Sequence, residues 1–207
     1  MTTVPLIENY TAALTIPGNV VSEGHYNLVK KITLQERDYF LKIYFNGGKG
    51  LRRFFGKSRA RREYENVKLF LRLGISTAPV VNFHEERYQG LEKRAWLLTE
   101  AIPASMDLMQ LLQNQDVHLR KRTWQETVFP QIIDYTQRLH HQRFVHHDLK
   151  WRNILVSGEH FVAVYFIDCP SGRRVYFSHV LEHGIVKDLA CLYVHATRIL
   201  SHTQCLR

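Results

Sequence analysis

The chain has few of the features that mark membrane, secreted and disulfide-bonded proteins. No apolar run approaches the roughly 18 residues that a membrane-spanning helix needs, so we expect no transmembrane segment. Residues 1–5 lack a basic region followed by an apolar core, so we expect no signal peptide. The three cysteines, Cys169, Cys191 and Cys205, are odd in number, widely spaced, and form no C-x-x-C pair. These absences favour a reducing, cytoplasmic location.

The histidines also lack the spacing of a metal site. Four of the twelve lie close together in sequence: His140, His141, His146 and His147. Tetrahedral zinc sites need defined spacing and usually cysteine or carboxylate partners, and no such set accompanies these histidines. We therefore expect structural roles for them, with His146 packed under the following loop and hydrogen-bonded to its backbone. The chain shows no internal repeat and no low-complexity segment.

The overall composition is that of an ordinary globular protein with a strong positive charge. Hydrophobic residues make up 45% of the chain and charged residues 23%. A length of 207 residues fits one large domain, or two small lobes that share a cleft. The net charge of +9 suggests an anionic partner: nucleic acid, an anionic membrane face, or a phosphorylated substrate. Charge alone does not choose among these.

The first hundred residues predict a small sheet with one helix. Strand-like stretches occupy residues 20–21, 27–34, 38–45, 78–83 and 94–99. A helix is predicted over 58–73, with Ser58 as its N-cap and Gly74 just beyond its end. Lys42 stands inside an apolar strand, which is unusual. It is either an edge-strand lysine that reaches water along its own stem, or a lysine aimed at nucleotide phosphates.

The second half of the chain predicts mainly helices. Helical spacing of apolar residues occurs over 105–114, 121–141 and 181–200. Ser105 is the expected cap of the first of these helices. Between the last two, Ser157-Gly158 is expected to turn a hairpin of two strands.

The stretch from His146 to Val156 carries the clearest chemical pattern. Asp148 follows His146 by two residues, Lys150 follows Asp148 by two, and Asn153 follows it by five. A further acid, Asp168, ends the next strand-like apolar run. This order of base, amide, strand hairpin and acid is typical of phosphoryl-transfer sites of the protein-kinase type.

Each of these residues suits one task in phosphoryl transfer. Asp148 can orient a substrate hydroxyl and accept its proton late in the reaction. Asn153 and Asp168 offer hard oxygen ligands for Mg²⁺ that bridges the phosphates of ATP. Lys150 can neutralise the transferring phosphoryl group.

Lys42 can hold the remaining phosphates if a carboxylate fixes its ammonium group. Glu63 is the first choice for that carboxylate, because it lies on the predicted helix just after the lysine strand. Glu65, two residues later, faces another side of the helix and is the second choice.

Several segments resemble the lipopolysaccharide kinases of Gram-negative bacteria, small relatives of protein kinases that phosphorylate heptose or Kdo sugars of the core. The catalytic string shares the family's H-x-D-L-x-x-x-N pattern. Residues 166–174 (F-I-D-C-P-S-G-R-R) resemble its counterpart of the kinase D-F-G segment, and residues 185–190 (I-V-K-D-L-A) its downstream motif. The resemblance covers roughly residues 20–200. It implies dependence on ATP and Mg²⁺, a bilobal kinase fold, a sugar hydroxyl as acceptor, and a structural Asp188 that braces the catalytic loop.

The chain departs from larger kinases at three points. It has no G-x-G-x-x-G, and only Gly18 and Gly24 lie near the expected phosphate loop. Cys169-Pro170 follows the metal-binding acid, so we expect no D-F-G-type flip. His147 stands where an arginine often precedes the base, so we expect no docking of an activation-loop phosphate.

A basic run between residues 51 and 62 is interleaved with Phe54 and Phe55. Its cations are Arg52, Arg53, Lys57, Arg59, Arg61 and Arg62. The run is either an ordinary solvated surface or a contact for a phosphate-rich acceptor or an anionic inner-membrane face. RNA binding is disfavoured, because no RNA-binding module surrounds the run.

Together these patterns predict an α+β, bilobal protein-kinase-like fold. A small β-rich N-lobe would span residues 1–102, and a short, mainly helical C-lobe residues 103–207. Adenine would lie against the segment from Glu100 to Ile102. The predicted activity is ATP-dependent phosphorylation of a lipopolysaccharide core sugar, in the cytoplasm or on the cytoplasmic face of the inner membrane. The alternatives are a kinase for a protein or small-molecule hydroxyl, and a non-catalytic pseudokinase that acts as a binding module.

Overall fold

The chain forms two compact units, each with its own core. The computed structural model describes residues 7–45, 56–88, 92–158 and 162–200. The first unit consists of Met1–Lys68 and Ala78–Ala101, and the second of Leu69–Thr77 and Ile102–Arg207. Within the described ranges, no helix combines the length and the apolar character needed to cross a bilayer.

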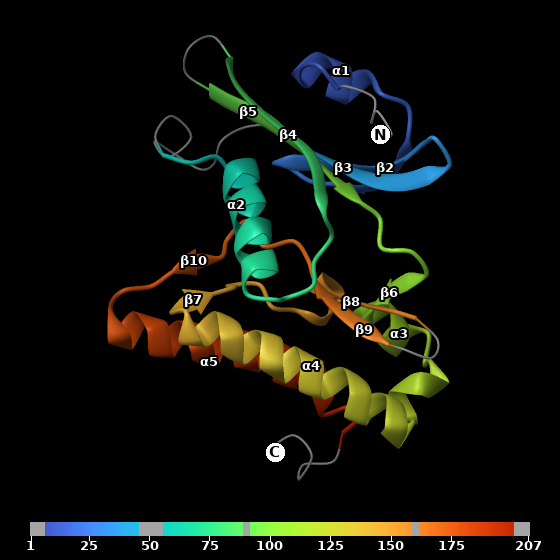
Figure 1. Cartoon of the computed structure of the whole chain (residues 1–207), viewed down its shortest axis with the longest axis vertical. Coiled ribbons are helices and arrows are strands. Elements are labelled where there is room, and N and C mark those ends of the chain that lie inside the picture. The colour runs from blue at the N-terminus through green and yellow to red at the C-terminus, as the bar shows by residue number, and fades with distance from the viewer. Residues whose placement is uncertain (1–6, 46–55, 89–91, 159–161, 201–207) are drawn as a thin grey trace. The chain divides into compact units, whose positions relative to one another are not determined.

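The first unit is built on a five-stranded antiparallel sheet with the strand order β1-β2-β3-β5-β4. The strands are β1 (Asn19–Glu23), β2 (Asn27–Leu34), β3 (Arg37–Tyr44), β4 (Val80–Tyr88) and β5 (Glu92–Glu100) (Figure 1). The helices are α1 (Tyr10–Thr15) and α2 (Arg59–Arg72). The last turn of α2 belongs to the second unit. Tyr39, Leu41 and Ile43 of β3 are buried in the core of this unit. Because side chains alternate along a strand, Lys42 projects from the opposite face of the sheet.

Helix α2 begins as the sequence predicts. The hydroxyl of Ser58 accepts a hydrogen bond from the backbone N–H of Arg61 at 3.1 Å, which confirms it as the N-cap. Gly74 follows the helix with a φ of +67°, a left-handed conformation that suits glycine at this place. The glycine-rich loop at 46–50 and the first part of the basic run, to residue 55, lie outside the described residues.

In its described residues, the second unit combines two small sheets with three helices and the last turn of α2. The helices are α3 (Leu108–Gln113), α4 (Arg122–His141) and α5 (Ser178–Ala196), with short 3₁₀ turns at η2 (Val117–Arg120) and η3 (Trp151–Asn153) (Figure 1). One sheet has the order β6-β8-β9, formed by β6 (Ser105–Asp107), β8 (Ile154–Ser157) and β9 (Ala163–Phe166). The other pairs β7 (Phe144–Val145) with β10 (Arg173–Arg174).

The core of this unit holds the residues between β7 and β8 in place from both ends. Phe144 on β7 and Ile154 on β8 are buried in one hydrophobic cluster with Val128 and Ile132 of α4. Trp151, in the middle of the segment, joins the same cluster, and its indole N–H donates to the Leu192 carbonyl at 2.9 Å. The polar residues between β7 and β8 are therefore fixed by apolar anchors on either side.

Two predicted helices have wrong boundaries. The helix expected over 105–114 begins at Leu108, because Asp107 and not Ser105 caps it by accepting from the N–H of Gln110 at 2.9 Å. Residues 105–107 pair with β8 instead, and the Ser105 hydroxyl donates to the Ile102 carbonyl at 2.8 Å. The helix expected over 181–200 runs from Ser178 to Ala196.

Candidate active site

The catalytic string forms a loop between β7 and β8 that is braced from α5. The carboxylate of Asp188 is fully buried and accepts the backbone N–H groups of His146, at 2.8 Å, and of His147, at 2.9 Å. The ring of His140 lies 3.3 Å from the same carboxylate. His147 has a φ of +65°, so the backbone turns sharply just before Asp148. The bracing role expected of Asp188 is confirmed.

His146 is buried beneath this loop, but the hydrogen bond predicted for its ring is wrong. Within the described part of the chain, neither ring nitrogen has a hydrogen-bond partner. The ring packs instead between Phe70, with centroids 6.0 Å apart, and Phe166, at 6.3 Å. Burial lowers the pKa of His146, which keeps the imidazole neutral at physiological pH.

Asp148 lies at the centre of a cluster of polar side chains. Lys150 Nζ is 2.5 Å from its Oδ1, and Arg152 Nη2 is 3.7 Å from its Oδ2. The amide nitrogen of Asn153 donates to the carbonyl of Asp148 at 2.8 Å and to its carboxylate at 3.2 Å. Burial raises the pKa of Asp148, but the hydrogen bond and charge of Lys150, with the charge of Arg152, outweigh it and hold the pKa below its usual range. Asp148 is therefore a carboxylate at neutral pH.

Asn153 and Asp168 lie at the same end of a strand pair, because Asn153 precedes β8 and Asp168 follows its antiparallel neighbour β9. Ile154 pairs with Phe166, and the N–H of Ile167 donates to the Asn153 carbonyl at 3.0 Å. Asp168 follows directly, with a φ of +56°. Both hydrogen bonds of the Asn153 amide nitrogen go to Asp148, so the amide oxygen is the atom of this side chain that could bind a cation. One carboxylate and one amide oxygen suit Mg²⁺, which keeps several waters and binds substrate phosphates.

The predicted pair of Lys42 and Glu63 forms inside the first unit. Lys42 Nζ lies 3.1 Å from Glu63 Oε2 and 3.3 Å from Oε1, and the two side chains are only 13% and 8% exposed. Glu65, the second choice, is paired with Lys57 at 2.6 Å instead.

Tyr44 also belongs to this pair, and the sequence reasoning missed it. The buried tyrosine donates its hydroxyl hydrogen bond to Glu63 Oε2, and its ring lies 5.4 Å from the Lys42 ammonium. The signal was present in the sequence, because residues two apart on a strand share a face and Tyr44 is two after Lys42.

The two residues assigned to adenine lie on either side of the division between the units. Glu100 is the last residue of β5, opposite Tyr39, and its N–H donates to the Pro79 carbonyl at 3.0 Å. Ile102 is the second residue after it and belongs to the second unit. Their contact with a nucleotide stays a prediction.

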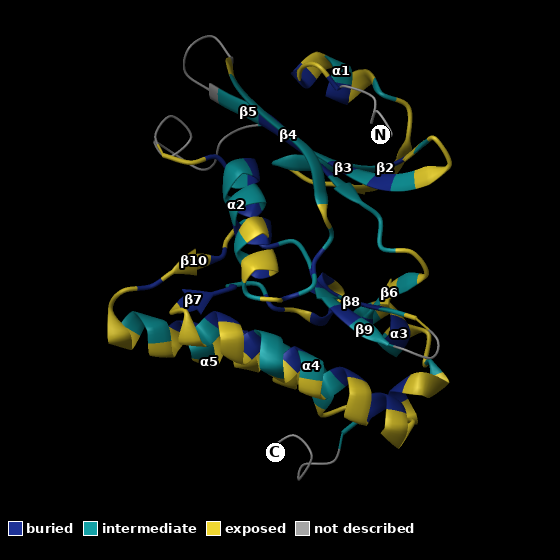
Figure 2. Ribbon diagram, in the orientation of Figure 1, coloured by how far each residue is buried: buried dark blue, intermediate teal, exposed yellow. Residues whose placement is uncertain are grey.

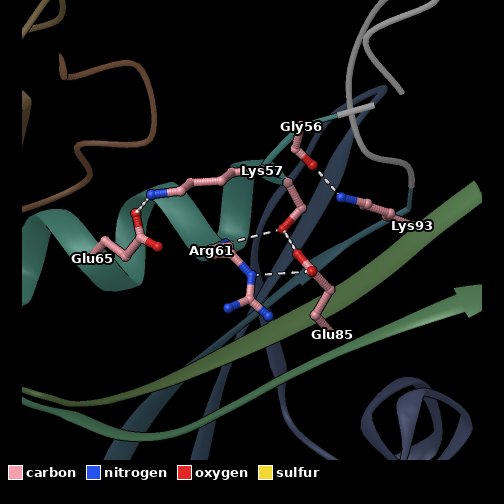
Figure 3. A network of polar contacts seen from close by, with 7 residues as sticks. Gly56, Lys57, Arg61, Glu65, Glu85 and Lys93 are labelled. Atoms are coloured by element: carbon pink, nitrogen blue, oxygen red, sulfur yellow. Dashed lines mark hydrogen bonds and ion pairs between the residues drawn. The ribbon is translucent and has the colours of Figure 1, made fainter. Parts of the chain in front are cut away.

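Part of the basic run serves the fold of the first unit. Arg61 Nε lies 3.1 Å from Oε1 of Glu85 on β4 (Figure 3). The Ser58 hydroxyl donates to the other oxygen of Glu85. Burial raises the pKa of Glu85, but the bonds from Ser58 and Arg61 prevail and lower it, so the carboxylate is ionised at neutral pH. With Lys57 also paired to Glu65, at least two of the basic residues form ion pairs within the unit and contribute little free charge to the surface.

Comparisons with known proteins agree with this geometry. The model of the family described as "Lipopolysaccharide kinase (Kdo/WaaP) family" matches residues 15–204. A solved structure described as "WaaP in complex with acyl carrier protein" is similar in fold, with a TM-score of 0.69 and 20% sequence identity, over 95% of this chain and 78% of that one. The comparison with curated proteins gave no significant match.

Proposed function

Since the chain belongs to the lipopolysaccharide kinase (Kdo/WaaP) family, we propose that Asp148 is the base of an ATP-dependent transfer to a core-sugar hydroxyl. The family and the similar fold make the chain a kinase that acts on the lipopolysaccharide core. The observation that supports the role of Asp148 is its setting: an ionised carboxylate held between Lys150 and Asn153 on a braced loop.

The reaction requires little covalent chemistry from the protein. The acceptor oxygen forms a bond to the γ-phosphorus of ATP as the bond from that phosphorus to the β,γ-bridging oxygen breaks, and ADP leaves. Asp148 accepts a hydrogen bond from the acceptor hydroxyl, which aims the oxygen, and takes its proton late in the transfer. Lys150 lies beside it and offsets the negative charge on the transferring phosphoryl group.

The remaining site residues are proposed to hold the nucleotide. Asn153 and Asp168 would bind Mg²⁺, which when present shields the phosphate charge. Lys42, fixed by Glu63, would contact the phosphates that are not transferred, and Glu100 and Ile102 would border the adenine. On this proposal residues 1–102 form the nucleotide-binding lobe, and residues 103–207 carry the catalytic and metal-binding loops.

The acceptor is proposed to be the sugar part of an anionic glycolipid, reached from the cytoplasmic face of the inner membrane. The net charge of +9 supports an anionic partner. Family membership favours the lipopolysaccharide core over a protein hydroxyl, a small molecule or a nucleic acid.

The test measures phosphate transfer from ATP, in the presence of Mg²⁺, to each of three acceptors: core oligosaccharide, a serine/threonine peptide mixture, and an aminoglycoside. We expect phosphate transfer to the oligosaccharide alone, and loss of transfer by at least about a thousandfold in Asp148→Asn and Asp168→Asn, because each removes a group with a role in the transition state. Transfer to the peptide or aminoglycoside instead would refute the sugar assignment. Equal turnover in wild type and both variants would refute the catalytic roles.

A further inference from the structure

The segment from Arg173 to Phe177, between Asp168 and α5, places aromatic and arginine side chains on the surface. Tyr176 and Phe177 are 80% and 71% exposed, more than any other large apolar side chain of the described residues. Arg173 and Arg174 are also exposed, whereas Val175 between the two pairs is buried. Figure 2 shows yellow at β10 and again just before the start of α5, with a dark blue break between them.

The backbone of this segment is fixed, although its side chains face solvent. Arg173 and Arg174 pair with Val145 and Phe144 as strand β10. The N–H of Val175 donates to the Arg143 carbonyl at 2.7 Å. The Arg143 side chain in turn donates to the carbonyls of Val175, at 3.1 Å, and Tyr176, at 2.5 Å.

Gly172, just before the segment, allows this close packing. A Cβ at this position would lie 2.3 Å from Cys169 Sγ and 2.6 Å from the Phe144 ring. The exposed side chains are therefore presented by a rigid backbone, which reduces the entropy lost when they bind a ligand.

The segment also lies beside the catalytic loop. Its strand partner, Val145, is three residues before Asp148 in the chain. His147 has a lowered pKa, first because it is partly buried and then because of the positive charge of Arg173. Arg173 thus pairs with the residue that lies two before His147 and three before Asp148.

We infer that residues 173–177 form the acceptor-recognition surface, where Arg173 and Arg174 bind phosphate groups on the core saccharide and Tyr176 and Phe177 pack against its sugar rings. This inference rests on the proposed function, because it names the part of the acceptor that the same site would bind. Guanidinium groups bind phosphate oxygens with two parallel hydrogen bonds, and aromatic faces cover apolar surface while tolerating polar edges. A phosphorylated saccharide therefore suits both the arginine pair, through its phosphates, and the aromatic pair, through its sugar rings.

An anionic membrane surface is the competing partner for exposed aromatic and basic residues. The position of the segment favours the acceptor, since a contact next to the base would orient the hydroxyl that reacts. The two partners differ in one measurable respect: only the membrane requires acyl chains.

The test uses deacylated, phosphorylated core oligosaccharide, which cannot insert in a bilayer. The variants are Arg173→Gln/Arg174→Gln and Tyr176→Ser/Phe177→Ser, and the control is Arg120→Gln/Lys121→Gln, which removes two exposed charges elsewhere in the second unit. We expect KM for the oligosaccharide to rise about tenfold in both test variants, with KM for ATP unchanged, because one loses hydrogen bonds to a charged group and the other loses aromatic packing. The control should match wild type. On oligosaccharide treated with a phosphatase, the arginine variant should no longer differ from wild type.

Two outcomes overturn the inference while the proposed function stands. One is an unchanged KM for the soluble oligosaccharide in both test variants. The other is a loss that appears only when the acceptor is embedded in vesicles, which would assign the segment to the membrane. Direct binding of the same oligosaccharide, measured by calorimetry in an Asp148→Asn background, separates the two claims. If wild type shows no turnover but binding still depends on residues 173–177, the proposed function fails and the surface stands.

Discussion

At the scale of single residues, the pKa of Asp148 is set by its neighbours. Burial alone would raise it, and Lys150 at 2.5 Å, followed by Arg152, brings it below the usual range. Asp148 therefore stays ionised to a lower pH than an ordinary aspartate, so the proposed base is in its proton-accepting form at neutral pH. The lowered pKa makes Asp148 a weaker base. This fits the proposed reaction, in which Asp148 mainly orients the acceptor hydroxyl and the proton moves late.

Removing Lys150 should raise the pKa of Asp148. In Lys150→Ala the two largest influences that lower this pKa are gone, so the acid limb of the kcat/KM profile moves toward neutral pH. The measurement is the pH dependence of kcat/KM for the acceptor, which reports the free enzyme. Lys121→Ala, which removes an exposed lysine elsewhere in the second unit, serves as the control. An acid limb at the same pH in Lys150→Ala and wild type would contradict this account of the site.

Sequence reasoning succeeded where spacing dictates contact and failed where packing does. Lys42 and Glu63 could be paired because a strand lysine and a helix acid occur in order, and Asp188 could be assigned to the loop backbone through the family resemblance. The ring of His146 could not be placed, because no pattern tells whether a buried imidazole meets a polar atom or two phenyl rings. Tyr44 was missed, although it lies two residues after Lys42 and therefore shares its face of the strand.

At the scale of elements, helix α5 fixes the catalytic loop through one carboxylate. Asp188 accepts two backbone N–H groups from the loop and lies near His140 of α4. Gly184, one turn earlier, lies against Val145, where a Cβ would come within 2.7 Å of the valine side chain. The close approach of Gly184 to Val145 and the buried carboxylate of Asp188 together determine where the loop begins.

The substitution Asp188→Ala should therefore affect both stability and catalysis. It leaves one buried and one partly buried N–H group without a partner, at an expected cost of about 3 kcal/mol in the free energy of unfolding. Because the loop that carries Asp148 loosens, kcat should fall while KM for ATP changes little. Urea denaturation and steady-state kinetics measure the two effects, with Glu182→Ala on the exposed side of α5 as the control. A variant as stable and as active as this control would show that α5 does not brace the loop.

Element boundaries were the least predictable part of the fold. The start of α3 depends on whether Ser105 or Asp107 caps it, and both residue types cap well. Pairing with β8 decides in favour of Asp107, since residues 105–107 are then extended. Such long-range pairing is invisible to local spacing, whereas strands β2 and β3 and helix α2 were predictable from their own apolar patterns.

At the scale of the whole molecule, charge alone could not name the partner. A net charge of +9 fits nucleic acid, membrane and phosphorylated substrate equally. The structure reduces the weight of the basic run, because Arg61 and Lys57 pair with Glu85 and Glu65. Family membership then favours the lipopolysaccharide core, and the exposed Arg173 and Arg174 lie on the strand that pairs with the residues just before the catalytic loop.

The most direct test of the central claim is the phosphate content of core sugars in cells. Lipopolysaccharide core would be analysed by mass spectrometry from cells that produce wild type, Asp148→Asn, or no copy of this protein. We predict a phosphorylated core sugar with wild type and its loss in both other strains, with the variant present at the wild-type level. Equal core phosphorylation with wild type and Asp148→Asn would contradict the account.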